Sequence, residues 1–151
     1  FMVGRCYIYG SHAEQPIPAN SIPLKIDAAA AFGTGEHDTT AGCLVALQRL
    51  KKYRPHVRHV MDMGCGTAIL AIAAAKLWRS ANISAYDNDA GAVRTSRENF
   101  ACNQLKKIPA YVSDGYKTQR VKREGKHDVV VANILARPLM RMDSERSCSQ
   151  S

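Results

Sequence analysis

The chain has 151 residues, a formal net charge of +8 and an ordinary composition, with 46% hydrophobic and 23% charged residues. This length predicts one domain with a sizeable core, and no apolar run approaches the roughly 18 residues of a membrane span. The five cysteines form no C-x-x-C pair, which argues against a disulfide framework or a zinc knuckle. Because the first residues also lack a secretory signal pattern, we expect a cytoplasmic protein with reduced thiols and no membrane association.

The positive charge is concentrated in two stretches, residues 49–58 and 117–126, each with five lysines and arginines. These cations are either solvated loops and helix ends or a site of attraction to an anionic partner such as RNA. No RNA-binding motif with interleaved aromatic residues is present. The sequence therefore predicts no sequence-specific binding of nucleic acid.

Two short apolar runs, Arg5–Tyr9 and Ile22–Asp27, come first along the chain. Three prolines interrupt this region, so we expect strands that lie outside the main sheet. Residues 1–27 are predicted to be an N-terminal β segment and linker. A helix follows, with Asp38 or Thr39 as its candidate N-cap, because leucines recur there at three-residue spacing: Leu44, Leu47 and Leu50.

From His59 onward, short apolar strands alternate with helices. The strand patterns are HVMDMG, NISAYD, AYVSDG and HDVVVANI. The helical patterns are AILAIAAAKLW and AGAVRTSRENFACNQL, the second with Asp89 as its N-cap. This alternation predicts parallel pairing with right-handed crossovers, and the apolar run VVVA is typical of a strand covered on both faces. The predicted fold class is α/β, with a doubly wound, mostly parallel sheet.

The first strand of this sheet ends in a glycine turn, DMGCGTAIL, where Gly64 and Gly66 let the backbone approach a ligand. Asp87 follows 21 residues after Gly66, the spacing at which a carboxylate grips a ribose. The alternative role for Asp87 is helix capping, which Asp89 is better placed to fill. Ile69 replaces the third glycine of a dinucleotide fingerprint, and no Walker lysine is present, which leaves an adenosine ligand without phosphates.

The glycine turn resembles the D-x-G-x-G-x-G loop of class I S-adenosylmethionine-dependent methyltransferases. Four segments, AFGTGEHDTT, DMGCGTAILAIAA, YDNDAGAVRTSRENFACN and VVVANILARPL, occur in the order found in one family. That family is the lysine methyltransferases of ribosomal large-subunit protein eleven, and the resemblance covers about Ile22–Leu139. It implies a Rossmann-like methyltransferase fold, S-adenosylmethionine as cofactor, and a ribosomal large-subunit protein as the partner methylated on lysine and α-amino groups.

The resemblance also implies roles for individual residues at the cofactor. Thr40 contacts S-adenosylmethionine, and Gly64 approaches its methionine part with Gly66 beside it. Asp87 binds the ribose, and Asp62, the acid that opens the glycine turn, orients that loop.

Two further positions follow strands. Asp114 comes after the third strand, where an adenine contact is common in the class. Asn133, in NILA, stands where amino-group methyltransferases place the asparagine of Asn-Pro-Pro-Tyr, and it is the expected catalytic and cofactor-binding residue. Its alternative role is to cap the strand.

The acidic and histidine residues of GEHDTT do not predict a metal site, because Glu36, His37 and Asp38 are adjacent and their side chains diverge. No metal is therefore expected. For His37, packing or bracing of the loop is an alternative as good as a catalytic role.

The chain departs from the family pattern at three places. Ala68 replaces the third glycine of the loop, and residues 143–151 resemble nothing in the family. The recognition domain and the later strands of the family are also absent, so we expect a fragment with a methyltransferase core over residues 28–142, truncated after its fourth strand. That strand, Val129–Asn133, is then an apolar edge, which we expect self-association, the N-terminal strands or the residues after Arg141 to cover. Two other functions stay open: an amine methyltransferase with another substrate, and a non-catalytic cofactor-binding module.

Overall fold

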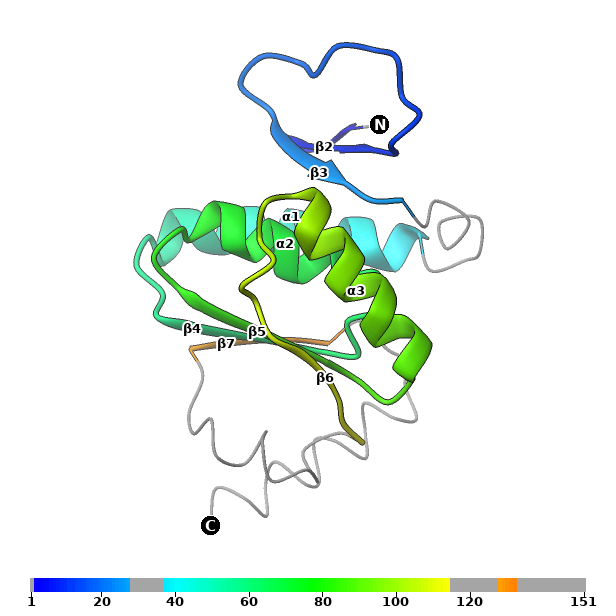
Figure 1. Cartoon of the computed structure of the whole chain (residues 1–151). Coiled ribbons are helices and arrows are strands. Elements are labelled where there is room, and N and C mark those ends of the chain that lie inside the picture. Colours follow the sequence, from blue (N-terminus) through cyan, green and yellow to red (C-terminus); the bar gives the residue numbers. More distant parts are fainter. Residues whose placement is uncertain (1, 28–36, 115–127, 133–151) are drawn as a thin grey trace.

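The computed structural model describes residues 2–27, 37–114 and 128–132, which are coloured in Figure 1. The elements in chain order are β1 (Met2–Val3), β2 (Cys6–Tyr9), β3 (Ile22–Lys25), α1 (His37–Tyr53), β4 (His59–Met63), α2 (Ile69–Leu77), β5 (Asn82–Asp87), α3 (Ala90–Cys102), β6 (Ala110–Val112) and β7 (Val129–Ala132).

The main sheet holds four parallel strands in the order β6-β5-β4-β7. The chain moves outward from β4 through β5 to β6 and then returns to the other side of β4. The strand order therefore reverses between β4 and β7, which makes this the switch point of a doubly wound sheet. The α/β fold predicted from the sequence is confirmed. Among the described strands β7 lies at the edge of the sheet, and self-association through it stays a prediction.

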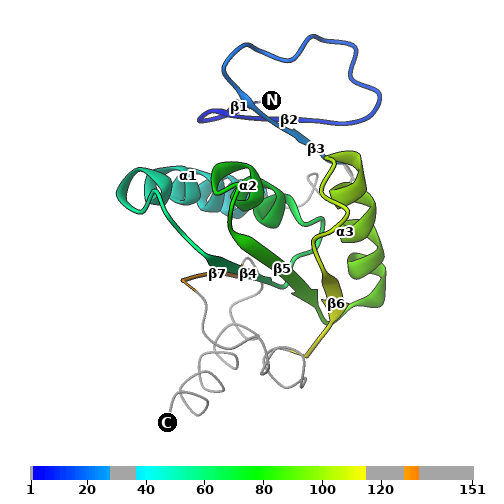
Figure 2. The same ribbon diagram turned by 60° about the vertical axis from the view of Figure 1, so that its left-hand side comes forward.

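The helices form a layer between two sheets (Figures 1 and 2). α1, α2 and α3 lie on one face of the main sheet, and the small sheet of β1, β2 and β3 lies on their far side. In the small sheet β1 pairs antiparallel with β2, and β2 pairs in parallel with β3, with Cys6 opposite Ile22. The N-terminal strands therefore lie outside the main sheet, as the sequence predicts.

α2 is apolar on every side because it lies in the middle of these layers. Every residue from Ile69 to Ala74 is buried, and a helix that is hydrophobic all round must find partners all round. Its alanines let the neighbouring elements approach closely. Leu24 of β3 and Leu44 of α1 belong to the same core cluster as α2, so one core joins the small sheet to the main one.

A second, smaller cluster covers the opposite face of the main sheet. Met61, Met63 and Tyr86 are buried there, next to the partly buried Val130. Because side chains alternate along a strand, Met61 points away from Val60, which belongs to the cluster on the helical side. The central strands β4 and β5 are thus buried on both faces, whereas β7, the VVVA strand, is fully buried only at Val131 and partly buried at its other positions.

The first helix differs from the prediction at its start. α1 begins at His37, so Asp38 and Thr39 lie within its first turn and neither is the N-cap. The spacing of the leucines predicts the buried face of the helix but not its first residue. None of the helices in the described part of the chain has the length and apolar character to cross a bilayer.

Replacing Leu24 with Ala tests whether the small sheet shares the core. Leu24 is fully buried at 0% exposure, so we expect the free energy of unfolding to fall by about 2–5 kcal/mol in one cooperative transition. Urea denaturation followed by circular dichroism measures it. The control Ile17→Ala, at a side chain 49% exposed, should change stability by less than about 0.5 kcal/mol. Two separate transitions in the Leu24 variant would contradict the shared core.

Candidate functional site

A glycine loop, residues 64–68, connects β4 to α2 at the carboxyl edge of the main sheet. Three of its residues adopt left-handed backbone conformations: φ is +77° at Gly64, +55° at Gly66 and +67° at Ala68. The N–H groups of Gly64 and Cys65 both donate to the carbonyl oxygen of Tyr86, at 2.7 and 2.9 Å, and this ties the loop to β5. A Cβ added to Gly66 would meet no atom of the described residues within 4 Å. The outer side of the loop at Gly66 is therefore open to a ligand.

Asp87, at the end of β5, holds this loop. Its Oδ2 accepts the N–H of Gly66 at 3.0 Å, and its Oδ1 accepts the N–H of Asp89 at 2.9 Å. An ionised carboxylate has about four acceptor positions, so both oxygens can still accept hydrogen bonds from the hydroxyls of a ribose. The alternative role of capping α3 belongs to Asp89, whose carboxylate accepts the N–H of Gly91 at 3.1 Å.

Asp62 lies under the loop, inside β4, and is buried at 1% exposure. Its Oδ2 accepts the N–H of Ala71 at 3.1 Å, which fixes the first turn of α2. Its Oδ1 is buried with no hydrogen-bond partner among the described residues. Burial raises the pKa of Asp62 to about 7, with the Ala71 N–H acting against the rise and the charge of Asp87 adding to it. The loop thus lies over a buried carboxyl that can accept a hydrogen bond when ionised and donate one when protonated.

Polar side chains of α3 hold the loop from the other side. Ser96 Oγ donates to the carbonyl oxygen of Gly66 at 2.8 Å, and Asn99 Nδ2 donates to that of Thr67 at 2.9 Å. Cys65 Sγ lies 3.1 Å from Ser96 Oγ, and burial raises the pKa of this thiol to about 12, so it is unreactive. The sequence patterns do not single out Ser96 or Asn99. The pattern that could have indicated them is the three-residue spacing of Ser96 and Asn99, which places two polar side chains on one face of a helix that packs against the sheet.

The same face of α3 reaches the small sheet. Asn99 Oδ1 accepts the N–H of Asp27 at 3.2 Å. Asn103 pairs with the backbone of Lys25 in the manner of a strand: its Oδ1 accepts the Lys25 N–H at 3.0 Å, and its Nδ2 donates to the Lys25 carbonyl at 2.8 Å. Asn99 is therefore the residue that bridges the glycine loop and the end of the N-terminal strands.

α1 brings Thr40 to this edge of the sheet. Thr40 is buried and lies three residues from Cys43, on the same face of α1. Burial raises the pKa of the Cys43 thiol, and the charge of Asp62 adds to the rise.

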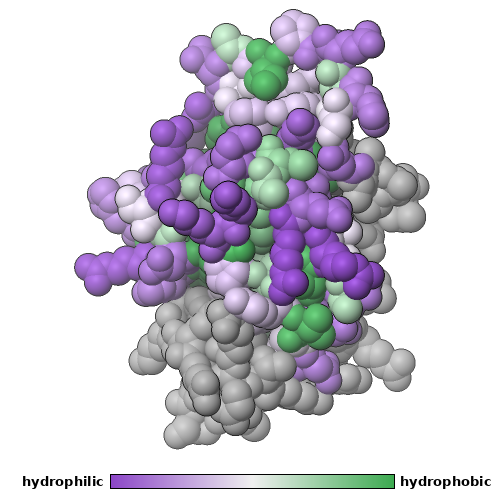
Figure 3. Space-filling model, viewed as in Figure 1, coloured by the Kyte–Doolittle hydropathy of each residue, from purple (hydrophilic) through white to green (hydrophobic). Residues whose placement is uncertain are grey.

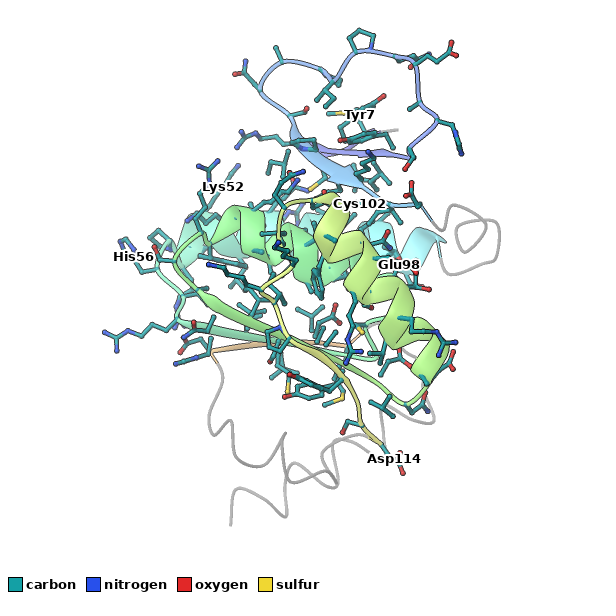
Figure 4. All side chains as sticks on the ribbon, in the orientation of Figure 1. Tyr7, Lys52, His56, Glu98, Cys102 and Asp114 are labelled. Carbon is teal, nitrogen blue, oxygen red and sulfur yellow. The ribbon has the colours of Figure 1, made fainter. Side chains whose placement is uncertain are left out.

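The remaining predicted residues lie beside Asp87 or outside the described residues. Asp114 follows β6 and is exposed (Figure 4), next to Ser113, whose N–H donates to the carbonyl oxygen of Asp87 at 2.8 Å, and its adenine contact stays a prediction. Asn133 and Glu36 lie outside the described residues, as do the side chains of His37 and Asp38. The structure thus brings together Thr40, Asp62, the two loop glycines and Asp87. Within the described segments no cluster of three or more His, Cys, Asp or Glu side chains could hold a metal ion.

Comparison with known proteins identifies the family. The family model described as ribosomal protein L11 methyltransferase (PrmA) matches residues 2–148. The chain belongs to this family. It is 41% identical over 140 residues to the ribosomal protein L11 methyltransferase of Rhizobium rhizogenes and 42% identical over 139 residues to that of a Caulobacter species. Each match covers 92% of this chain and 47% of the relative, so the chain spans about half the length of the curated relatives it matches.

Solved structures agree with this assignment. The ribosomal protein L11 methylase of Lactobacillus delbrueckii subsp. bulgaricus superimposes with a TM-score of 0.79 at 26% identity, over 95% of this chain and 70% of that one. Coclaurine N-methyltransferase bound to N-methylheliamine and SAH superimposes with a TM-score of 0.50 at 17% identity, over 68% of this chain and 32% of that one, a likeness of fold alone.

Replacing Asp62 with Asn tests the buried carboxyl. Since its pKa is raised in the folded state, the native protein holds a proton that the unfolded chain loses above about pH 4, and stability falls as the pH rises toward 7. The amide of the variant cannot titrate, and its carbonyl oxygen can still accept from Ala71. Relative to the parent, Asp62→Asn should gain about 1–3 kcal/mol between pH 5 and pH 7. Urea denaturation of ligand-free protein at both pH values measures this, and a pH-independent difference would refute it.

Asn99 of α3 and Asn103, the residue that caps its C-terminus, provide a matched pair. Each variant to Ala loses about 1–3 kcal/mol of stability, because each leaves backbone groups without partners. Only Asn99→Ala frees the Thr67 carbonyl of the glycine loop. We expect amide hydrogen exchange at residues 66–68 to speed up in Asn99→Ala more than in Asn103→Ala at equal stability. Equal protection of the loop in both variants would show that Asn99 does not hold it.

Proposed function

We propose that this chain binds S-adenosylmethionine against the glycine loop and Asp87. The observation that supports this most directly is the Asp87 carboxylate, which accepts the N–H groups of Gly66 and Asp89 and keeps acceptor positions for a ribose. The open space beside Gly66 suits a ligand that passes close to the backbone. The buried Oδ1 of Asp62 adds an acceptor for the polar end of such a ligand or for a water that serves it.

We further propose that the site belongs to a methyltransferase acting on amino groups of ribosomal protein L11. When bound, the cofactor supplies a methyl group on a sulfonium, an activated donor with a neutral leaving group. The amine lone pair would form the new N–C bond as the C–S bond breaks with its electrons on sulfur, and the amine proton would pass to solvent. The protein therefore contributes mainly by positioning.

The residues of this chain would divide that task. Asp87 and Gly66 would fix the ribose end of the cofactor. Asp62 would hold the first turn of α2 behind the loop through the Ala71 N–H, and Ser96 would hold the loop itself through the Gly66 carbonyl. Asn133, which lies outside the described residues, is proposed to accept a hydrogen bond from the incoming amine. A lysine amine has an ordinary pKa of about 10.4, so a site that excludes water and offers the Asn133 carbonyl favours its neutral form.

Calorimetric titration with S-adenosylhomocysteine tests the cofactor assignment. In Asp87→Asn, the amide replaces a charged acceptor and can serve only one of the two N–H groups, so affinity should fall by about 10–100-fold, the equivalent of one charged hydrogen bond. Asp89→Asn is the matched control, because asparagine also caps helices well, and its affinity should stay within about twofold.

Three results would contradict the proposal: no heat of binding in the parent chain, tighter binding of NAD than of S-adenosylhomocysteine, or equal effects of the two variants. Incubation with radiolabelled S-adenosylmethionine and ribosomal protein L11 tests the transfer separately. Binding without transfer would limit this chain to holding the cofactor.

A further inference from the structure

The fold gathers positive charge at the edge of the main sheet opposite the glycine loop. Connections that lead from a helix end into a parallel strand all lie at this edge, whereas the loop and Asp87 lie at the carboxyl edge. Six exposed cations occupy these connections and the helix ends beside them, and we call them the basic edge: Lys52, Arg54, Arg58, Arg79, Lys106 and Lys107. They come from three separate parts of the chain, so no single run in the sequence reveals the set.

Negative charge does not balance the basic edge. The segments 49–61, 76–86 and 103–113 contain no Asp or Glu. Among the described residues, the carboxylate of Asp128 lies near this edge, just before β7. Its Oδ2 already accepts the N–H groups of Arg58 and His59, at 2.8 and 3.1 Å. The three helix C-termini contribute only about half a negative charge each. The positive charge of the six cations is therefore larger than the negative charge of the three helix C-termini beside them.

An aromatic ring stands within the same edge. Tyr53, the last residue of α1, lies between Lys52 and Arg54 and is 83% exposed, the most exposed large hydrophobic side chain of the described residues. Figure 4 places Lys52 and His56 at this end of the molecule, far from Asp114. Strongly hydrophilic side chains follow the same side in the space-filling view of Figure 3.

We propose that the basic edge binds single-stranded RNA without sequence preference, with phosphates on its cations and a base stacked on Tyr53. Cations combined with an exposed ring are the two parts of a single-strand binding surface, whereas an acidic peptide or a membrane surface would use the charges and leave the ring without a stacking partner. The choice of RNA over DNA rests on the proposed function, because the family acts on a ribosomal protein. The surface itself does not depend on that function.

Fluorescence anisotropy of a labelled 20-nucleotide oligouridylate, titrated with the whole chain at several KCl concentrations, tests the proposal. The double variant Lys52→Gln with Arg79→Gln removes two phosphate contacts, so the slope of log K against log salt should fall by about 1.4, and affinity in about 0.1 M salt by about 25-fold. Tyr53→Ala should lower affinity at least about fivefold through lost stacking, with the slope unchanged.

The matched control is Arg94→Glu, an exposed residue of α3 outside the basic edge. It changes the net charge by the same two units and should alter affinity less than about twofold. An equal loss in the control would show that only net charge matters, and no effect of Tyr53→Ala would show that no base stacks there. Oligothymidylate bound as tightly as oligouridylate would overturn the assignment to RNA. The same samples are also titrated with S-adenosylhomocysteine. Loss of RNA binding with cofactor binding intact is a failure of this surface, and loss of cofactor binding alone is a failure of the proposed function.

Discussion

The candidate site depends on one carboxylate that accepts two backbone N–H groups. Asp87 binds the glycine loop through Gly66 and the start of α3 through Asp89, at 3.0 and 2.9 Å. These contacts fix two neighbouring connections of the main sheet relative to one another, because one is the turn from β4 to α2 and the other the turn from β5 to α3. Hydrogen bonds to a charged acceptor are stronger than those between neutral groups. A ligand that adds to this carboxylate therefore meets a geometry that is already set.

The helical layer then transmits this geometry through the molecule. α3 and its C-cap carry three buried polar side chains, Ser96, Asn99 and Asn103, and their hydrogen bonds reach from the carbonyls of the glycine loop to the backbone of β3. A protein loses stability when a buried polar group of this kind is left without its hydrogen-bond partner. These hydrogen bonds therefore favour one position of the small sheet against the helices over others. The apolar α2, packed between the two sheets, supplies the area that stabilises the docked state.

Local patterns made part of the site predictable. The glycine turn, the cap at Asp89 and the carboxylate at Asp87 follow from residues within about 20 positions of each other, and the strand–helix alternation fixes the edge of the sheet where they meet. Ser96, Asn99 and Asn103 were not recognised, because an amphipathic helix with polar residues looks alike whether they face solvent or a backbone partner far away in the sequence. Ala68 shows the opposite limit. Its place in the loop was evident, but its left-handed φ of +67° was not, since glycine is the residue that such a conformation favours.

The pairing of Lys25 with Asn103 also sets an order for folding during synthesis. The two residues are 78 positions apart, so β3 leaves the ribosome well before its partner on α3 exists. At about 5–20 residues per second the wait is roughly 4–16 s. Until α2 and then α3 have been made, the apolar side chains of β2 and β3 lack the helices that cover them. The nascent N-terminal segment is therefore the part of this chain with the longest exposure to chaperones and to premature association.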